Sequence, residues 1–377
     1  MKNIAVIFGG KSAEHDVSII TAHIPIIESL RSSEMFDVWP IYITREGRWY
    51  CDKVMNDLAF FRLAGWEKRV AAMKPVSLTL NDGFEISWAG RFGGKRQKID
   101  IVFPSMHGTY GEDGTIQGLF ELADVPYVGA GVLGSAVGMD KVVQKHLLQQ
   151  AKIPVAPGIW FLFSEFESHR KKIIGQIEKK LRYPCFVKPA NMGSSVGISK
   201  AHNKTELIDA IFLAGEFDRK ILVEKGIEQA REIECSVLGN DDPTASVPGE
   251  IIPSNEFYDY DAKYVDGKSA AIIPAKLLKS VTRKIQEYAV SAFKALSCEG
   301  MARVDFLVTK KTNKIFLNEI NTIPGFTSIS MYPKLWQASG LSYPALLDKL
   351  IELAIDRHEA KKKLKTSYTP KKDWYKS

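Results

Sequence analysis

Two acids, an amide and an arginine lie among apolar residues in the stretch "RVDFLVTKKTNKIFLNEINTIPGFTS", which begins at Arg303. The stretch alternates like two strands joined by a turn, and alternation places Arg303 and Asp305 on one face. Glu319 and Asn321 likewise share one face of the return strand. A turn centred near Thr312 would pair Asp305 with Glu319. The same register would pair Arg303 with Asn321.

Directly opposed residues of a hairpin have Cβ atoms about 5 Å apart, and two carboxylates that close repel unless a cation or proton lies between them. The oxygens of Asp305, Glu319 and Asn321 suit Mg²⁺, which takes few protein ligands and keeps places for water and phosphate. The guanidinium of Arg303 could hold an anion or an oxyanion. By spacing alone, a solvent-facing strand with salt bridges explains these residues equally well.

A second candidate is the stretch "KPANMGSSVG" from Lys188 to Gly197, which has two glycines, two serines and an asparagine between apolar strands. Such a loop offers N–H groups and hydroxyls to phosphate oxygens, and Lys188 adds a positive charge. It is not a Walker loop, because the G-x-x-x-x-G-K-[ST] order is absent. A glycine-rich hairpin without a ligand is the alternative. Glu224 in "LVEKGI" could accept a hydrogen bond from an adenine amino group.

The bulk composition is that of a globular protein of 377 residues and 42.1 kDa, long enough for two or three domains. Hydrophobic residues make up 45% and charged residues 25%, and no apolar run approaches the roughly 20 residues that span a bilayer. We interpret the start, "MKNIAVIFGG", as a first strand rather than a signal peptide, because it lacks a cleavage site.

Cysteine usage and charge distribution narrow the class further. The four cysteines are widely separated and form no C-x-x-C pair, which favours neither zinc nor disulfides and fits a reducing cytoplasm. The net charge is +7, but the last 17 residues hold seven lysines and one aspartate. The other 360 residues are therefore almost neutral. We expect a solvated tail rather than a nucleic-acid contact.

Hydrophobic patterning predicts an α/β start to the chain. "KNIAVIF" is a buried strand, Gly9 and Gly10 form a turn, and a helical pattern follows in which Pro25 predicts a kink or an early end. Further stretches that we interpret as strands or strand pairs are "FDVWPIYI", "IDIVFPSMHG", "YPCFVKPANMGSSVGISKA" and "RKILVEKGIEQAREIECSVLGN". Predicted helices lie in "MDKVVQKHLLQQ", "VTRKIQEYAVSAFKAL" and "YPALLDKLIELAIDRHEAKKK". Residues 51–98 show no clear period.

Taken together, these motifs resemble the D-alanine-D-alanine ligases of the ATP-grasp superfamily, from Lys2 to about Ala360. The matching stretches, in family order, are "GGKSAEHDVS", "HGTYGEDGTIQGLFE", "MDK", "VKPANMGSSVGISK", "EKGIEQAREIE", "EFYDYDAKY", "ARVDF" and "NEINTIPGFTS". The resemblance implies ligation of two D-alanine molecules for peptidoglycan precursors. ATP would phosphorylate one D-alanine carboxylate, and the amine of the second would attack the acyl phosphate.

The resemblance also implies an overall organisation. We expect an α/β fold with α+β character in its C-terminal half: an N-terminal parallel α/β domain and two α+β domains that sandwich ATP. The expected bounds are 1–124 for the substrate domain, 125–216 and 217–360 for the two ATP-grasp domains, and 361–377 for a poorly ordered tail. A cytoplasmic homodimer that uses two Mg²⁺ ions, or Mn²⁺, is implied, with no nucleic-acid or membrane partner.

For catalysis, the resemblance assigns the magnesium ions to Asp305, Glu319 and Asn321. It assigns the tetrahedral oxyanion to Arg303 and to the backbone N–H of Gly325. Lysines matching Lys141 and Lys188 contact phosphates in the family, and acids matching Glu224 and Glu232 hold adenine and ribose. The complete set of implied ATP contacts is Lys141, Lys188, Ser195, Glu224, Lys225, Gly226, Ile227, Glu232, Lys263 and Asn318.

For the amino-acid substrates, Glu14 matches the residue that grips the ammonium of the first D-alanine. The family connects this acid to residues matching Ser194 and Tyr264, and this triad locks a loop, here about 256–270, over the site. Residues matching His107 and Glu112 lie near the first substrate. Positions matching Ser330 and Met331 receive the carboxylate of the second.

Three other functions remain as alternatives. A ligase for D-lactate or D-serine as second substrate keeps the same machinery, although Tyr264 and its loop favour D-alanine. An ATP-grasp ligase for another amino acid would share the nucleotide half. A non-catalytic binding protein is the third, and the intact set of Arg303, Asp305 and Glu319 argues against it.

Overall fold

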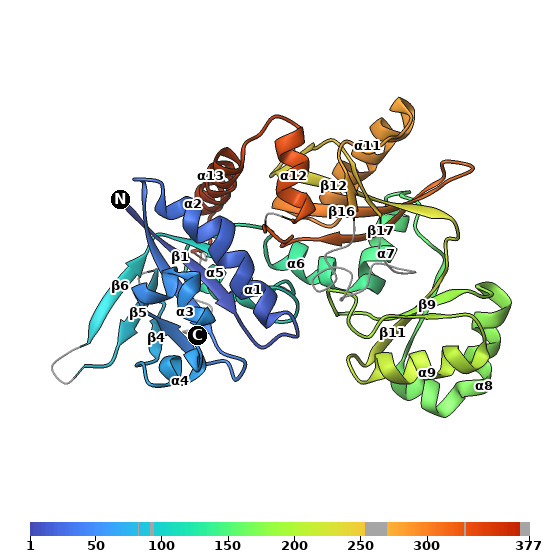
Figure 1. Cartoon of the computed structure of the whole chain (residues 1–377), viewed down its shortest axis with the longest axis horizontal. Coiled ribbons are helices and arrows are strands. Elements are labelled where there is room, and N and C mark those ends of the chain that lie inside the picture. The colour runs from blue at the N-terminus through green and yellow to red at the C-terminus, as the bar shows by residue number, and fades with distance from the viewer. Residues whose placement is uncertain (82, 91–93, 253–269, 328, 370–377) are drawn as a thin grey trace.

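The computed structural model describes residues 1–81, 83–90, 94–252, 270–327 and 329–369. Figure 1 shows three groups of elements: N-terminal elements in blue, a green lobe around β9 and β11, and a yellow-to-red group around β12, β16 and β17. Helices α6 (Val132–Met139) and α7 (Lys141–Gln150) lie where the three groups meet. The site described below lies at this junction.

The N-terminal sheet has the strand order β3-β2-β1-β7, with β1 (Lys2–Gly9) parallel to both β2 (Phe36–Ile43) and β7 (Ile101–Pro104). β3 (Trp49–Cys51) is antiparallel to β2. Residues 4–8 of β1 are completely buried, as expected for a strand covered on both faces. The prediction of a parallel sheet that starts with the first strand is confirmed.

Pro25 does not end the helix that follows β1. The chain runs through α1 (His15–Thr21), a π-helical segment over Ala22–Ile27 and α2 (Glu28–Arg31) without a break. Proline has no N–H to donate, and the wider π-helical turn accommodates it. The sequence signal was correct in marking an irregularity at Pro25, but the helix widens there and continues.

The region with no clear sequence period folds as small helices and a second sheet. It contains a 3₁₀ turn at Lys53–Asn56, α3 (Leu58–Arg62) and α4 (Trp66–Ala71). The antiparallel sheet β4-β5-β6 follows, with bounds Val76–Thr79, Phe84–Trp88 and Lys95–Ile99. Helix α5 (Thr115–Leu122) then leads to the junction.

The central lobe has its own antiparallel sheet in the order β10-β9-β11-β8. Its elements are β8 (Gly158–Leu162), α8 (Phe163–Lys180), β9 (Cys185–Pro189), β10 (Ser199–Ala201), α9 (Lys204–Gly215) and β11 (Lys220–Lys225). The apolar core of this lobe, which includes Phe166, Ile177 and Val223, is separate from the other cores. Because β11 pairs with both β8 and β9, we propose that the second domain boundary lies after Lys225 rather than near 216.

The C-terminal sheet is antiparallel, in the order β15-β14-β12-β16-β17, with β13 beside β12. Its strands are β12 (Ala230–Gly239), β13 (Thr244–Ala245), β14 (Gly249–Ile252), β15 (Ala270–Ile272), β16 (Gly300–Thr309) and β17 (Ile315–Asn321). Among the described residues, the helices that accompany it are α11 (Lys279–Ala295), α12 (Met331–Ala338) and α13 (Tyr343–Lys362). Helix α13 thus includes the first two residues of the predicted tail.

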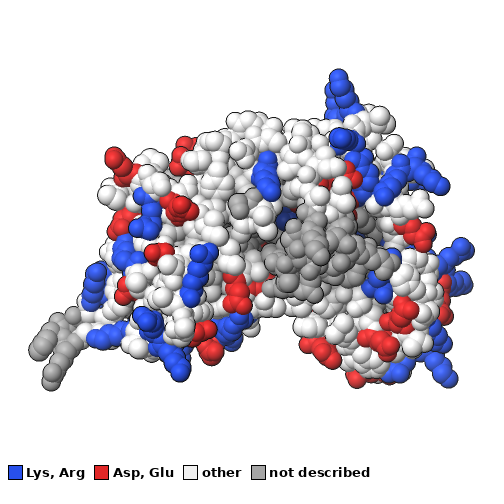
Figure 2. Space-filling view, in the orientation of Figure 1, with Lys and Arg blue, Asp and Glu red and all other residues white. Residues whose placement is uncertain are grey.

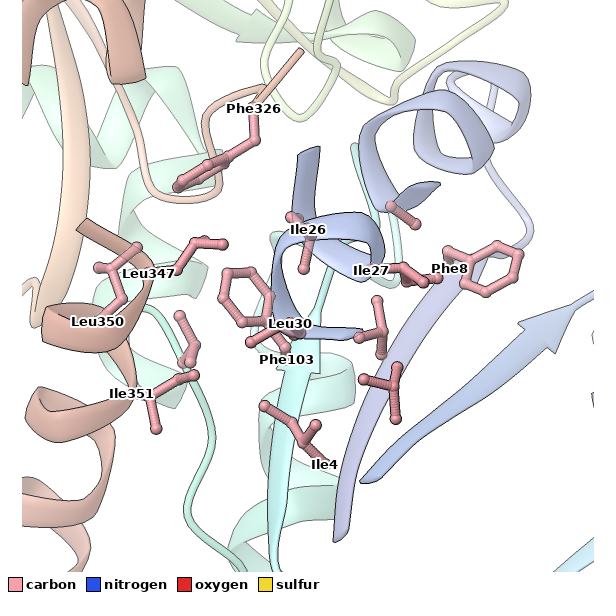
Figure 3. Packing of buried hydrophobic residues seen from close by; sticks show 14 of the residues in the cluster. Ile4, Phe8, Ile26, Ile27, Leu30, Phe103, Phe326, Leu347, Leu350 and Ile351 are labelled. Carbon is pink, nitrogen blue, oxygen red and sulfur yellow. The ribbon is translucent and has the colours of Figure 1, made fainter. Parts of the chain in front are cut away.

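One large apolar cluster joins the N-terminal sheet to the C-terminal elements. Figure 3 shows Leu347, Leu350 and Ile351 of α13 directed toward Phe103 of β7, with Phe326 beside them. Ile4 and Phe8 of β1 belong to the same cluster. The N-terminal and C-terminal groups therefore share a core, whereas the central lobe does not contribute to it.

The four cysteines are buried and free. No helix among the described residues is both long and apolar enough to cross a membrane. On the face shown in Figure 2, lysine and arginine side chains are interspersed with aspartate and glutamate. This mixture offers no continuous basic surface on that face.

Candidate active site

The β16–β17 hairpin has the register expected from the sequence at its functional end. Asp305 pairs with Glu319, and Arg303 pairs with Asn321. Nearer the turn, the register shifts by one residue, so that Phe306 pairs with Leu317. The predicted pairing of the two acids is therefore confirmed, although the strands are not regularly paired along their whole length.

The shift is a β-bulge, and Asn318 is its extra residue. Leu317 and Ile320 are buried in the core, while Asn318 and Glu319 between them are both only partly buried. A bulge bends the strand and redirects a side chain, so it brings two consecutive polar residues toward the site. The Nζ of Lys188, from β9, donates a hydrogen bond of 3.2 Å to Asn318 Oδ1.

Each of the paired acids has its own cation. Arg303 donates from Nε and Nη2 to the two Asp305 oxygens at 2.7 Å, and its Nε lies 3.1 Å from Glu234 Oε2. Lys141 Nζ lies 3.6 Å from Glu319 Oε2. Although burial alone would lower it, the pKa of Arg303 is raised well above its usual value by these carboxylates. Sequence reasoning missed Glu234, which lies opposite Asp305 on the neighbouring strand β12.

The oxygen donors on this hairpin fit a magnesium site in kind and position. Asp305, Glu319 and Asn321 lie on one face of adjacent strands, and Mg²⁺ is commonly held by one or two carboxylates plus substrate phosphates. Among the described residues there is no cluster of three or more His, Cys, Asp or Glu side chains that could hold a metal. The two carboxylates would therefore hold the ion together with the Asn321 amide and phosphate oxygens.

Opposite the hairpin, a buried carboxylate contacts two lysines. Glu224, at the end of β11, lies 2.5 Å from Lys188 Nζ and also forms an ion pair with Lys145 Nζ. All three side chains are at most 8% exposed. Lys141, one helical turn before Lys145 on α7, donates a 2.7 Å hydrogen bond to Met192 O. Sequence reasoning missed Lys145, although its position four residues after Lys141 places both on one helix face.

Charge pairing outweighs burial at this carboxylate. Burial alone would raise the pKa of Glu224, but the positive charges of Lys145 and Lys188 outweigh burial and lower it to about 2. The pKa of Lys188 is raised because the charges of Glu224 and Glu319 exceed the opposing effect of burial. The pKa of Lys145 is lowered, by burial and by the nearby charge of Lys188. Glu224 therefore carries its charge at neutral pH.

The loop between β9 and β10 reaches the N-terminal domain. Ser194 Oγ donates a hydrogen bond to Glu14 Oε1, so the structure brings this predicted pair together. Ser194 and Ser195 have φ values of 48° and 61°, a left-handed conformation that is uncommon for serine and concentrates at functional sites. A Cβ on Gly193 would lie 2.5 Å from Glu14 Oε2, so the close approach requires glycine.

Next to Glu14, His107 and Glu112 form a buried pair. His107 Nδ1 lies 3.4 Å from Glu112 Oε1, and Nε2 lies 3.1 Å from Thr21 Oγ1. Burial raises the pKa of Glu112, and the negative charge of Glu14 raises it further. The pKa of His107 is raised because its hydrogen bond to Glu112 and the nearby acids outweigh burial. A cationic imidazole beside Glu14 would suit the carboxylate of an amino acid.

The segment after β17 is anchored through Phe326. The ring of Phe326 packs edge-on against Phe103, with centroids 6.1 Å apart, and lies at a tilt to the ring of Tyr332, with centroids 5.4 Å apart. This packing fixes the adjacent Gly325, where a Cβ would lie 2.9 Å from Ser330 Oγ. The backbone that we assign to the oxyanion is therefore fixed to the shared apolar core.

Ser330 and Met331 lie at the start of α12, but they differ in exposure of their side chains. Ser330 is the N-cap, and its Oγ is 2.8 Å from Thr327 Oγ1. The Met331 side chain packs with Ile251 and Leu335 in an apolar cluster. Only the backbone of Met331 can therefore meet a substrate carboxylate, as the first N–H groups of a helix commonly do.

Among the described residues, the remaining predicted nucleotide contacts lie on β12 or at and just after the end of β11. Lys225 ends β11, and its N–H donates to Pro157 O at 2.9 Å, while Gly226 N–H donates to Pro184 O at 3.0 Å. Ile227 follows these residues and is partly buried. Glu232 lies two residues before Glu234 on β12 and hence on the same sheet face. Lys263 and Tyr264, predicted for phosphate and for the triad, lie outside the described residues.

Two antiparallel sheets thus face each other, one bearing acids and the other lysines, and a glycine–serine loop crosses from the second sheet to the N-terminal domain. In Figure 1, β9 and β11 lie below β16 and β17, with α7 beside both pairs. This arrangement defines an ATP-grasp fold, the class of enzymes that hold ATP between two such sheets.

Comparison with known proteins specifies the family. Residues 3–130 match the family model described as the N-terminus of D-Ala-D-Ala ligase, and residues 147–352 match the model of its C-terminus. Together the two matched segments cover most of the chain. The protein belongs to the D-alanine–D-alanine ligase family.

Similar sequences and solved structures agree with that assignment. The D-alanine–D-alanine ligase of Chloroherpeton thalassium is 50% identical over 368 residues, 96% of this chain and 98% of the relative. The structure of the Coxiella burnetii D-alanine–D-alanine ligase, at 40% identity, has a TM-score of 0.82 over 96% of both chains. The VanG D-Ala:D-Ser ligase of Enterococcus faecalis is also 40% identical, with a TM-score of 0.80 over 94% of this chain and 99% of that one.

Proposed function

We propose that this protein joins two D-alanine molecules into D-alanyl-D-alanine at the expense of ATP, for peptidoglycan synthesis. The observation that carries the proposal is the close approach of two charged pairs. Asp305 pairs with Glu319 on the hairpin, and Lys188, which is paired with the buried Glu224, donates a 3.2 Å hydrogen bond to Asn318 of the same hairpin. This geometry suits a nucleotide triphosphate with its metal ions. The identity of the amino acid is supported by the names of the most similar relatives and by Glu14 with its Ser194 contact.

The chain's own side chains can stabilise the charges of the reaction. Lys141 and Lys188 would hold the phosphates, and the Arg303 guanidinium would stabilise the oxyanion formed when the second amine attacks. Bound magnesium would neutralise phosphate charge and polarise the transferred phosphoryl group. Asp305 and Glu319, with Asn321, would hold it.

The amino-acid substrates would lie at the N-terminal side of this machinery. Glu14 would accept hydrogen bonds from the first ammonium, while its bond to Ser194 ties the phosphate loop to the occupied site. The Gly325 N–H would face the same reacting carbon as Arg303. A closed loop would exclude water, which matters because an acyl phosphate hydrolyses readily.

We also infer a homodimer located in the cytoplasm. The apolar side chains of Ile20 and Ile24 are 44% and 39% exposed on the helical segment that begins with α1, a face that a second copy could cover. Sedimentation velocity of the purified chain would test this, and a single species at monomer mass would contradict it. Free, buried cysteines are consistent with a reducing compartment.

The direct test supplies the protein with ATP, Mg²⁺ and D-alanine alone. We expect ADP release and a product with the mass of D-alanyl-D-alanine. D-serine is the specific competitor to add in equal amount, because the VanG D-Ala:D-Ser ligase matches as well as the Coxiella ligase does. A mixed product dominated by D-alanyl-D-serine would replace our proposal with that second function, and D-lactate provides the corresponding depsipeptide test.

A further inference from the structure

Lys145 is a buried charged residue for which the reaction above has no role. It lies on α7, whose Gln144 donates hydrogen bonds to Gly138 O at 2.8 Å and to Ile320 O of β17 at 3.3 Å. Helix α7 is therefore fastened to the acid-bearing hairpin. Lys145 is only 5% exposed, and its Nζ forms an ion pair with Glu224.

The carboxylate of Glu224 is the counterion of two ammonium groups, those of Lys145 and Lys188. Lys188 Nζ is 2.5 Å from one Glu224 oxygen and 3.2 Å from Asn318 Oδ1. To hold a phosphate, Lys188 must turn at least partly away from Glu224. A buried carboxylate that loses its counterion is strongly destabilised, because desolvation is no longer offset. Lys145 supplies a second counterion that need not move.

We propose that Lys145 is a positioning residue of the nucleotide site, which keeps Glu224 charged and in place so that Lys188 is released to a phosphate. The inference rests on the proposed function only for the assignment of Lys188 to phosphate. The pKa of Glu224, lowered to about 2 because the charges of both lysines outweigh burial, agrees with this role. Without Lys145, Glu224 would retain Lys188 as its counterion. Glu224 would then compete with the nucleotide phosphates for Lys188.

The test measures the dissociation constant of MgATP by titration calorimetry in the full chain. Lys145→Met should raise this constant about tenfold or more, the effect of losing an interaction with a charged partner. The KM for D-alanine should not change. Lys145→Arg keeps the charge and should stay close to wild type, and Lys171→Met, at an exposed lysine of α8, is the matched control. Unchanged MgATP affinity in Lys145→Met would overturn the proposal.

A second comparison separates positioning from simple packing. In a Glu224→Gln background the carboxylate charge is gone, so adding Lys145→Met should change MgATP affinity by less than about threefold. An equal loss in both backgrounds would mean that Lys145 only fills space. If Lys145→Met does not fold, Lys145→Gln carries the same comparison. Binding of MgATP is measured separately from turnover. A wild-type protein that binds MgATP but makes no dipeptide would therefore refute the proposed function and leave the role of Lys145 standing.

Discussion

The two sides of the nucleotide site use the same kinds of charged group in opposite proportions. On the side of β11 and α7, one carboxylate, Glu224, is shared by two lysines. On the side of β12 and β16, one guanidinium, Arg303, is shared by two carboxylates. An excess of positive charge suits phosphate oxygens, and an excess of negative charge suits metal cations. We infer from this contrast that the lysine-rich side would hold the phosphates and the carboxylate-rich side the metal ions.

Removing an acid from the carboxylate-rich side should have the largest effect. Glu319→Ala deletes a ligand that we assign to the metal ions, and we expect turnover to fall by about 10²–10³-fold or more. The measurement is ADP release at increasing Mg²⁺. Glu352→Ala, at an exposed acid paired with Lys349 on α13, is the control and should keep full turnover. Normal turnover with normal Mg²⁺ dependence in Glu319→Ala would refute the metal assignment.

The β9–β10 loop links the lysine-rich side to Glu14, which we assign to the first amino acid, and Gly193→Ala should disturb this link. The new Cβ would lie 2.5 Å from Glu14 Oε2, so we expect the KM for the first D-alanine to rise about tenfold. The control is Gly175→Ala in α8, where a Cβ meets nothing within 4 Å. That change should stabilise the fold by about 0.5–1 kcal/mol. Unchanged D-alanine kinetics in Gly193→Ala would separate this loop from the first substrate.

Acid should weaken the lysine-rich side through Glu224, whose pKa is lowered to about 2 in the fold from an ordinary 4.5. The stabilisation is complete above the unfolded value and is lost as pH falls toward the folded one. Between pH 4.5 and 2, the free energy of unfolding should fall by up to about 1.4 kcal/mol per pH unit more in wild type than in Glu224→Gln. Urea unfolding at several pH values measures this difference, and parallel curves would contradict it.

The smallest effect is expected from shortening the lysine-rich chain end. Helix α13 ends at Lys362, and Lys361 pairs with Glu121, so the informative deletion begins after Thr366. Removing residues 367–377 should leave turnover and MgATP affinity within about twofold of wild type, because exposed chain ends contribute little to a fold. A large loss of turnover would assign the tail a role in the site.

The sequence predicted one side of the site better than the other. Strand alternation and a guessed turn placed Asp305 opposite Glu319, and the structure confirms this pair. The assumed turn was slightly misplaced along the sequence. The bulge at Asn318 shifts the register by one residue, so Asp305 and Glu319 are paired all the same. Alternation cannot predict a bulge, because an extra residue leaves no mark in the polar pattern.

The lysine-rich side could not be read from the sequence in the same way. Lys145 and Glu224 come from a helix and a strand 79 residues apart, and nothing local indicates their contact. Glu234 was missed for the same reason, since the strand of its partner Arg303 is a neighbour in space but lies far away in the sequence. Pro25 was read correctly as an irregularity, yet helix statistics do not tell a kink from a π-helical turn. The family resemblance supplied what local patterns could not.

The apolar cluster that joins β1 to α13 has a consequence for the order in which this chain can fold during synthesis. Ile4 and Phe8 leave the ribosome among the first residues, but Leu347 and Ile351 of the same cluster, which lie beside Phe103, leave near the end. Until then the part of this cluster that α13 buries stays exposed, and exposed apolar surface favours aggregation. The central lobe, with its separate core, can fold on the ribosome while the first sheet still waits for its last helix.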